Sequence, residues 1–322
     1  MNEFSLIQHY FESLSPKRKD VLLGIGDDCA LLQCPADHVI AVSIDTLVEG
    51  IHFFADVDPQ TLGHKSLAVG LSDLAAMGAT PAWFTLALTL PEVNEQWLNS
   101  FSLGLANLAQ QYNIQLVGGD TTRGPLTISI QVHGFVEADK ALRRNAAQLG
   151  DMIYVTGTLG DAGAALHIQL QQWHEESLTE NDKQYLYTRL ERPTPRVTIG
   201  QDLLGLASSA IDISDGLLAD LGHILEKSSL GARLDLTKLP ISQVLAKTNR
   251  KKAETFALQS GDDYELCFTV PPQHFAKMEQ QFKGICTRIG MITDDDGIYF
   301  INENDELINL NTKKAGYDHF KE

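Results

Sequence analysis

The chain of 322 residues lacks the features of several common protein classes. No apolar stretch approaches the roughly 20 residues that a membrane-spanning helix needs, so we expect no membrane partner. The N-terminal Met-Asn-Glu-Phe-Ser-Leu has neither a basic flank nor a secretory core, which predicts no signal peptide and a cytoplasmic location. The formal net charge of −17 is the opposite of the basic face that nucleic-acid binding requires, so no nucleic-acid partner is expected.

The cysteines and histidines form no recognisable metal-binding or catalytic motif. The four cysteines show no Cys-x-x-Cys pairing and no zinc spacing, so they are read as isolated thiols in a reducing compartment. The ten histidines form no His-Glu-x-x-His arrangement. Neither zinc chemistry nor covalent thiol catalysis is therefore expected.

The common nucleotide-binding signatures are also absent. There is no Walker loop, the Gly24-x-Gly26 pattern lacks the third glycine of a dinucleotide fingerprint, and the protein-kinase motifs are missing. Nucleotide chemistry would therefore need a different phosphate cradle. Gly118-Gly119-Asp120-Thr121 is a candidate, because two glycines let backbone N–H groups approach a phosphate while Asp120 holds a metal.

What the chain does have is five aspartate-bearing motifs, most of them at the end of an apolar run beside Gly, Ser or Thr. Each alone is compatible with an ordinary turn or helix cap, since these are the usual turn residues. If several converge, they form an all-oxygen pocket suited to Mg²⁺ bridging to phosphates. The five motifs are Gly24–Asp28, Ser43–Thr46, Leu71–Asp73, Gly118–Thr121 and Asp212–Gly216.

Hydrophobic periodicity predicts alternating helices and strands, which indicates an α/β or α+β first half. The apolar pattern lapses around residues 138–150, so we predict one domain over 1–140 and a second over 150–322. Helices are expected over 4–14, 58–77, 97–112 and 217–227, after Asp161 and after Pro272; strands over 38–44, 83–90, 114–117, 126–136, 152–156, 210–213 and 264–270.

The segment Gly157-Thr-Leu-Gly-Asp161 leads from a predicted strand into an Ala-rich predicted helix. Two interpretations are open. The helix N-terminus can hold an anion, because its N–H groups are unpaired. Alternatively, the segment is a capped strand-to-helix turn with no ligand.

Five motifs together resemble one family. Gly-Ile-Gly-Asp-Asp-Cys-Ala, Leu-Ser-Asp-Leu-Ala-Ala-Met-Gly-Ala, Gly-Gly-Asp-Thr-Thr-Arg-Gly, Asp-Ile-Ser-Asp-Gly-Leu and Asp-Tyr-Glu-Leu are similar, in this order, to bacterial thiamine-monophosphate kinases. The resemblance extends over essentially the whole chain, including the terminal Gly-Tyr-Asp-His-Phe. The wider superfamily includes aminoimidazole ribonucleotide synthetase and selenophosphate synthetase.

The resemblance implies a two-domain α/β (α+β) subunit with the aminoimidazole ribonucleotide synthetase-like fold, dimerising through strands of the first domain. It implies ATP as co-substrate with several Mg²⁺ ions, in a cleft between the domains. The implied reaction transfers the γ-phosphoryl group of ATP to thiamine monophosphate, giving thiamine diphosphate and ADP. The acceptor phosphate is the nucleophile, so no protein nucleophile is expected.

The resemblance also assigns roles to residues. Gly119, Asp120, Arg144 and Ser214 match ATP contacts, whereas His52, Asp262 and Tyr317 match contacts to the thiamine substrate. Asp27 is expected to hydrogen-bond its own turn. The metal positions are Asp28, Ser43, Ile44, Asp45, Asp73 and Asp120 in the first domain and Asp212 and Asp215 in the second.

Two positions depart from the family pattern. Ile44 stands where the family often has threonine, so only its backbone carbonyl is available to a metal. Asp262 replaces a glutamate, which puts its direct contact with substrate in question, with a bridging water as the alternative. Two other functions are compatible with these motifs: an ATP-dependent synthetase acting on another phosphorylated metabolite, and a nucleotide-binding scaffold without turnover.

Overall fold

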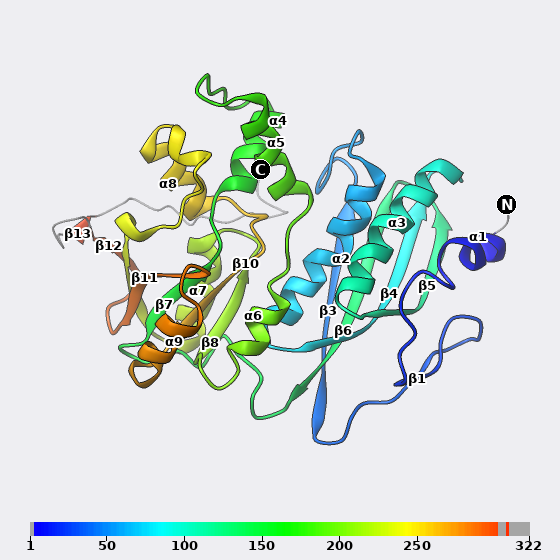
Figure 1. The fold of residues 1–322 in the computed structure, drawn as a ribbon, viewed down its shortest axis with the longest axis horizontal. Helices are drawn as coiled ribbons and strands as arrows, with labels where there is room; N and C mark the ends of the chain where they lie inside the picture. The colour runs from blue at the N-terminus through cyan, green and yellow to red at the C-terminus, as the bar shows by residue number, and fades with distance from the viewer. Residues whose placement is uncertain (1–2, 302–306, 309–322) are drawn as a thin grey trace. The chain divides into compact units, whose positions relative to one another are not determined.

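The computed structural model describes residues 3–301 and 307–308 of the chain (Figure 1). The chain divides into two compact units. Unit 1 comprises the chain up to Leu74 together with Ala79–Ala141, and unit 2 comprises Ala75–Gly78 and the chain from Leu142 onward. None of the helices in the described part is long and apolar enough to cross a membrane.

Unit 1 is built on a four-stranded sheet in the order β3-β6-β4-β5. Neighbouring strands are antiparallel except for β4 and β5, which run parallel. Two helices, α2 (Pro59–Ala76) and α3 (Glu95–Gln111), cover one face of this sheet (Figure 1). The strands are β3 (His38–Val48), β4 (Thr80–Leu90), β5 (Gln115–Arg123) and β6 (Thr127–Glu137).

Local sequence explains where these two helices begin. The Asp58 side chain accepts the Thr61 N–H at 2.8 Å, and the Asn94 side chain accepts the Trp97 N–H at 3.0 Å. Each cap satisfies an N–H group that the first helical turn leaves unpaired. The predicted Asp58-Pro59 start is thereby confirmed.

Two glycines let α2 and α3 approach each other closely. A Cβ atom added at Gly63 would lie 2.1 Å from the Phe101 carbonyl oxygen, and one added at Gly104 would lie 1.8 Å from that of Gln60. Any side chain at either position would push the helix backbones apart.

The two faces of the sheet differ in exposure. Ile128, Ile130 and Val132 alternate along β6 and are completely buried beneath the helices. On β3, by contrast, Val42 and Ile44 are 52% and 63% exposed. We call this side of the sheet, away from α2 and α3, the open face.

A hairpin and a short helix complete unit 1. Strands β1 (Val21–Leu23) and β2 (Leu31–Leu32) pair with each other, and Val21 and Leu32 pack against buried Trp83. The short α1 (Glu3–Tyr10) contacts α3 and β5.

Unit 2 contains a seven-stranded mixed sheet in the order β13-β12-β9-β11-β7-β10-β8. All neighbours are antiparallel except β12 and β9, which are parallel. The strands are β7 (Met152–Thr156), β8 (Ser209–Ile213), β9 (Gly231–Asp235), β10 (Glu265–Val270), β11 (Cys286–Thr293), β12 (Ile298–Ile301) and β13 (Leu307–Ile308).

Two hydrophobic clusters form the core of unit 2. The larger one joins the sheet to α7 through side chains such as Ile153, Ile213 and Leu221. The smaller one joins α4, α5 and α8 around Phe256. The α-helices of this unit are α4 (Asp161–Gln169), α5 (Glu180–Glu191), α6 (Val197–Asp202), α7 (Leu217–Ser228), α8 (Arg250–Gln259) and α9 (Phe275–Gln281), with single 3₁₀ turns at Leu236–Lys238, Leu245–Lys247 and Pro272–His274.

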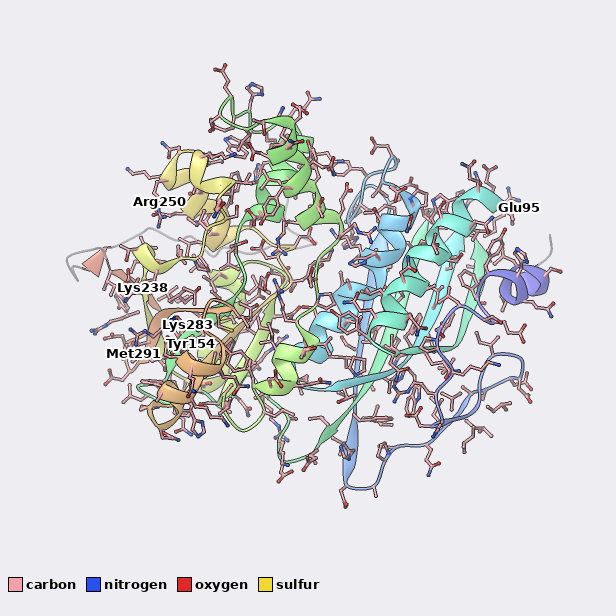
Figure 2. The ribbon with its side chains drawn as sticks, viewed as in Figure 1. Glu95, Tyr154, Lys238, Arg250, Lys283 and Met291 are labelled. Atoms are coloured by element: carbon pink, nitrogen blue, oxygen red, sulfur yellow. The ribbon has the colours of Figure 1, made fainter. Side chains whose placement is uncertain are left out.

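Tyr154 of β7, labelled in Figure 2, ties the sheet to α9. Its ring stacks on Phe268 with centroids 5.7 Å apart, and its hydroxyl donates to the Glu279 carboxylate at 2.8 Å. The fold thus consists of two sheet-and-helix units, in agreement with the two-domain mixed fold expected from the sequence.

Candidate functional site

Two carboxylates of unit 1 lie side by side between the sheet and α2. Asp45 extends from β3 and Asp73 from α2, and the Ser43 hydroxyl donates to the Asp73 carboxylate. Burial, reinforced by the neighbouring Asp73 carboxylate, raises the pKa of Asp45 to about 7. The sheet and the helix therefore hold two mutually repelling acids together.

This pair fits a divalent cation. The Asp45 Oδ2 atom is buried and has no hydrogen-bond partner within the described structure. Buried polar atoms are nearly always paired, so an unpaired carboxylate oxygen beside a second carboxylate is unusual. Hard cations such as Mg²⁺ take this kind of oxygen ligand.

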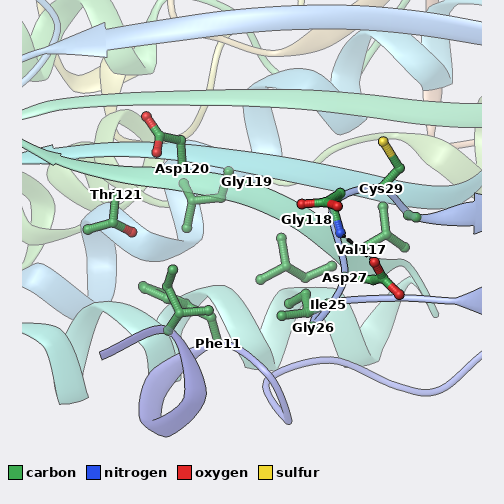
Figure 3. A pocket seen from close by; sticks show the side chains of 15 residues that line it. Phe11, Ile25, Gly26, Asp27, Cys29, Val117, Gly118, Gly119, Asp120 and Thr121 are labelled. Carbon is green, nitrogen blue, oxygen red and sulfur yellow. Dashed lines mark hydrogen bonds between the residues drawn. The ribbon is translucent and has the colours of Figure 1, made fainter. Parts of the chain in front are cut away.

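A second group of predicted residues lines a cavity of about 530 Å³ at the β5 edge of unit 1 (Figure 3). Asp27 and Asp28 come from the loop after β1, and Gly119 and Asp120 come from β5. Apolar side chains, including Phe11 of the segment after α1, line another part of the wall. Figure 3 shows the Asp120 carboxylate turned away from Phe11.

The loop that carries Asp28 is organised by its neighbour. The Asp27 carboxylate accepts the Asp28 N–H at 2.9 Å, which confirms that Asp27 hydrogen-bonds its own turn. Asp28 itself is exposed.

Strand register separates these two groups of acids. Asp45 is aligned with buried Ile130 and Leu86, so it faces the helices. Asp120 is aligned through Ala87 with Ser129 and Thr46, in a row on the open face. Side chains of directly paired residues project to the same side of a sheet, so the two carboxylates project to opposite sides.

Unit 1 therefore presents a buried pair and a cavity-lining pair instead of one four-aspartate cluster. Among the residues that the structure describes, no three His, Cys, Asp or Glu side chains come together closely enough to hold a metal ion alone. A metal bound here would need further oxygen ligands from substrate or water, which is the usual situation for Mg²⁺.

Three of the five motifs lie in regular elements; the helix expected over 58–77 already included Leu71–Asp73, whereas the strands that carry Asp45 and Asp120 run further than the sequence predicts. Asp45 lies within β3, Asp73 within α2 and Asp120 within β5. β5 continues to Arg123 because it pairs with β4 as far as Leu90. The local sequence does not predict this continuation, because glycine has a low strand propensity. The Gly118–Thr121 segment is therefore part of a strand.

The Asp212–Gly216 motif of unit 2 does form a turn, between β8 and α7. Asp212 is buried at the end of β8, and Asp215 is partly exposed in the turn. The buried Asp220 carboxylate accepts the N–H groups of Ser214, Asp215 and Gly216 at 3.1, 3.0 and 3.1 Å. Burial raises the pKa of Asp220 to about 7 against the opposing effect of these bonds.

The start of α4 also makes internal hydrogen bonds. The Gly160 N–H donates to the Asp263 carboxylate at 2.8 Å, and Asp263 is 1% exposed. Thr158 and Ser242 donate to Asp161 at 2.7 and 2.6 Å. These bonds pair the Gly160 N–H and not the N–H groups of the first helical turn, so both interpretations of Gly157–Asp161 stay predictions.

Asp262 lies in a strained turn that packs on the Ser214 turn. Its N–H donates to the Ser214 carbonyl at 2.9 Å, and the Tyr264 N–H donates to the Ile213 carbonyl at 2.8 Å. Both Asp262 and Tyr264 adopt the left-handed conformation, with φ of 64° and 50°. For a tyrosine this conformation is rare and costs on the order of 1 kcal/mol or more.

Sequence reasoning missed a buried ion cluster beside this turn. Glu265 is inaccessible to solvent and accepts from Arg189 at 2.8 Å, from the Arg196 Nε atom at 2.6 Å and from the Thr156 hydroxyl. The sequence contained a signal, because Glu265 is the glutamate of the Asp-Tyr-Glu-Leu motif and Arg196 ends the Arg-Pro-Thr-Pro-Arg segment.

The remaining predicted residues fall at scattered positions. His52 closes the turn after β3, where its Nδ1 atom accepts the Val48 N–H at 3.0 Å. Arg144 is exposed, and its carbonyl accepts the Ser228 hydroxyl at 3.2 Å. Ile44 directs its side chain to the open face. Tyr317 lies outside the described residues.

Comparison with known proteins places this architecture in a family. The family described as AIR synthase related protein, N-terminal domain, matches residues 26–136, and the corresponding C-terminal domain family matches residues 148–302. The chain therefore belongs to the AIR synthase related proteins.

More specific matches extend over nearly the full length. The chain is 51% identical over 323 residues to the thiamine-monophosphate kinase of Escherichia coli K12, covering 99% of this chain and 98% of the relative. It belongs to the thiamine-monophosphate kinase family.

Two solved structures agree with this membership. The crystal structure of thiamine-monophosphate kinase from Stenotrophomonas maltophilia K279a is 49% identical, with a TM-score of 0.83, covering 88% of this chain and 92% of that one. A structure described as AaThiL complexed with AMPPCP and TMP is 30% identical, with a TM-score of 0.77, covering 92% of each chain.

Proposed function

We propose that the chain is a thiamine-monophosphate kinase, which transfers the γ-phosphoryl group of ATP to the phosphate of thiamine monophosphate. The products are thiamine diphosphate and ADP. The observation that carries the proposal is the full-length identity of 51% to a thiamine-monophosphate kinase, found together with the buried, unpaired Asp45 oxygen beside Asp73. A relative of the same family is described in complex with AMPPCP and TMP.

Mg²⁺ is the metal we assign, because the donors are oxygens and both substrates are phosphates. Bound Mg²⁺ would neutralise charge on the two polyanions and orient them. The proposed ligands in unit 1 are Asp28, Ser43, Asp45, Asp73, Asp120 and the Ile44 carbonyl; those in unit 2 are Asp212 and Asp215.

For the nucleotide we propose Gly119 and Asp120 in the unit 1 cavity, together with Arg144 and Ser214. The absence of side chains at Gly118 and Gly119 leaves the backbone open to a phosphate. The cavity also has an apolar wall that includes Phe11 and Leu116, which suits the less polar part of a nucleotide. The exposed Arg144 guanidinium offers a planar fork for bidentate phosphate contact.

For thiamine monophosphate we propose His52, Asp262 and Tyr317. Because the His52 Nδ1 atom accepts a backbone N–H, the proton of the neutral ring lies on Nε2. The Ser214 turn fixes the backbone of Asp262, so its shorter side chain cannot be compensated by a shift of the main chain.

No residue of the chain is required as a nucleophile. An oxygen of the acceptor phosphate attacks the γ-phosphorus of ATP, and the bond to the β-phosphate oxygen breaks as ADP leaves. The contribution of the protein is in-line positioning of two anions that repel each other.

We further propose that the enzyme works in the cytoplasm as a homodimer joined through the open face of unit 1. Val42 and Ile44 on β3 expose apolar surface of the kind that an interface between copies would cover. In this proposal unit 1 supplies both the interface and most of the metal ligands.

The test is a coupled ADP-release assay with thiamine monophosphate, thiamine and aminoimidazole precursors as separate acceptors. ADP release that requires thiamine monophosphate, with thiamine diphosphate as product, is the expected result. ADP release with another acceptor alone would favour a synthetase of the same superfamily. Nucleotide binding without turnover on any acceptor would favour the scaffold function.

A further inference from the structure

One buried carboxylate of unit 2 organises the turn that carries three predicted ligand-binding side chains. Asp220 lies in the first turns of α7, is 3% exposed, and accepts three consecutive N–H groups through its Oδ2 atom. These N–H groups belong to Ser214, Asp215 and Gly216. A single acceptor thus fixes the orientation of every peptide plane in the turn.

This arrangement decides how the turn can recognise a ligand. A helix start with free N–H groups attracts phosphate directly. Here the N–H groups of Ser214, Asp215 and Gly216 already donate to Asp220, so these three residues can contact a ligand only through their carbonyls and side chains. The orientation of Ser214 and Asp215 therefore depends on Asp220.

The Ser214 turn in turn contacts the neighbouring turn, which carries Asp262. The Asp262 N–H donates to the Ser214 carbonyl, and a Cβ atom added at Gly261 would lie 2.2 Å from that same oxygen. A displacement of Ser214 therefore displaces the backbone of Asp262 as well. The two turns are therefore in contact with each other, and the Ser214 turn is hydrogen-bonded to Asp220.

We propose that Asp220 is a positioning residue, which couples the nucleotide-binding Ser214 turn to the substrate-binding Asp262 turn. The proposal rests on the proposed function for the identity of the ligands. Without the Asp220 acceptor, three buried or partly buried N–H groups lose their partner and the turn adopts another conformation. The neighbouring turn then loses the Ser214 carbonyl that holds it in place.

The experiment compares three variants of the full chain. Asp220→Ala removes the acceptor, and Asp220→Asn retains an acceptor oxygen of the same size without the charge. Leu221→Ala is the matched control, because Leu221 is fully buried in the same helix but contributes no hydrogen bond to the turn. Thermal melts identify any general loss of stability.

Two readouts are measured for each variant: the Kd of a non-hydrolysable ATP analogue in the presence of Mg²⁺, and the KM for thiamine monophosphate. For Asp220→Ala both should rise by about tenfold or more; for the Kd of the analogue this is a change of about 1.4 kcal/mol in the binding free energy. Asp220→Asn should recover most of the loss. Leu221→Ala should melt earlier while keeping both constants near the wild-type values.

Two results would overturn the proposal: Asp220→Ala behaving like Leu221→Ala, or Asp220→Asn failing to recover nucleotide binding. A rise in only one of the two constants would contradict the coupling of the turns. If the wild-type chain does not phosphorylate thiamine monophosphate, the proposed function fails. The nucleotide-binding comparison can still be made in that case, because it requires no turnover.

Discussion

At the scale of single residues, Asp45 shows most directly the conflict between stability and function in unit 1. Its carboxylate is buried beside that of Asp73, and its Oδ2 atom has no protein partner among the described residues. Two adjacent buried acids destabilise a fold, because burial disfavours the charged form of each and the charges repel. A bound cation reverses both effects.

We predict that Asp45→Asn lowers the kinase rate by orders of magnitude but raises the melting temperature of the metal-free protein. Removing one charge ends the repulsion, and it also removes a proposed ligand. Activity assays and thermal melts with and without Mg²⁺ measure both effects. The exposed Glu92, changed to Gln, is a control that removes the same charge elsewhere in unit 1. Near-normal turnover of Asp45→Asn at limiting Mg²⁺ would contradict the metal assignment.

His133 on β6 allows a prediction about pH. Burial lowers the pKa of His133, against a hydrogen bond involving Trp83, and its Nδ1 atom has no partner within the described residues. The unfolded chain, with a histidine pKa of about 6.5, therefore binds more protons than the folded protein near pH 6. The contribution of His133 to stability is present above the histidine pKa of the unfolded chain, about 6.5, and is lost as the pH falls below that pKa.

We accordingly expect His133→Gln to lose less stability than the wild type between pH 7.5 and pH 5.5. Urea unfolding at both pH values measures the difference. His223→Gln, at an exposed position of α7, should retain the wild-type pH dependence. Equal pH dependence in all three proteins would show that His133 is as easily protonated folded as unfolded.

At the scale of elements, the α2–α3 contact depends on glycine. At Gly104 a Cβ atom would lie 1.8 Å from a backbone oxygen of α2, whereas Gly222 in α7 has no atom within 4 Å of that position. Gly104→Ala should therefore destabilise the protein by about 3 kcal/mol or more, because two helix backbones must separate. Gly222→Ala should be neutral or stabilising by up to about 1 kcal/mol, because alanine favours a helix.

Chemical denaturation of the two variants provides the comparison. Similar stability for Gly104→Ala and the wild type would mean that α2 and α3 do not pack as closely as described. A large loss for Gly222→Ala would indicate an unrecognised contact on α7.

The helices and strands also show how much of the structure the sequence predicts. The strand over 152–156 and the helix start at Asp58-Pro59 were predicted correctly, because an apolar run and a cap are local signals. The continuation of β5 through Gly118 and Gly119 was not predicted, because it depends on pairing with β4. The division of the acids between two sides of the sheet follows from register, which no local pattern specifies.

The hydrogen bonds of Asp220 could not be predicted from the sequence either. The sequence places Asp220 five residues after Asp215, a spacing that by itself predicts no contact between Asp220 and the turn. Only the folded turn brings its carboxylate to three consecutive N–H groups. The cluster around Glu265 depends in the same way on residues distant in sequence, Arg189 and Arg196.

At the scale of the whole molecule, we predict that the open face of unit 1 mediates dimerisation. Val42→Lys places a charge within the exposed apolar surface of β3 and should convert a dimer to a monomer. Val93→Lys is the matched control, since Val93 is 50% exposed, close to the 52% of Val42, but lies in the loop between β4 and α3. Light scattering coupled to size exclusion measures the mass. A dimeric Val42→Lys variant, or a wild-type monomer, would contradict the prediction.

The internal carboxylates at the starts of α4 and α7 have a consequence for selectivity. Free phosphate, sulfate or an uncomplexed nucleotide finds the Gly160 N–H already bonded to Asp263 at one turn, and the N–H groups of Ser214, Asp215 and Gly216 already bonded to Asp220 at the other. At the α7 turn the remaining polar side chains include Asp212 and Asp215, which repel such anions. A cation carried by the incoming nucleotide changes that repulsion to attraction. We therefore expect this part of the protein to bind bare anions weakly and to prefer nucleotides that arrive as metal complexes.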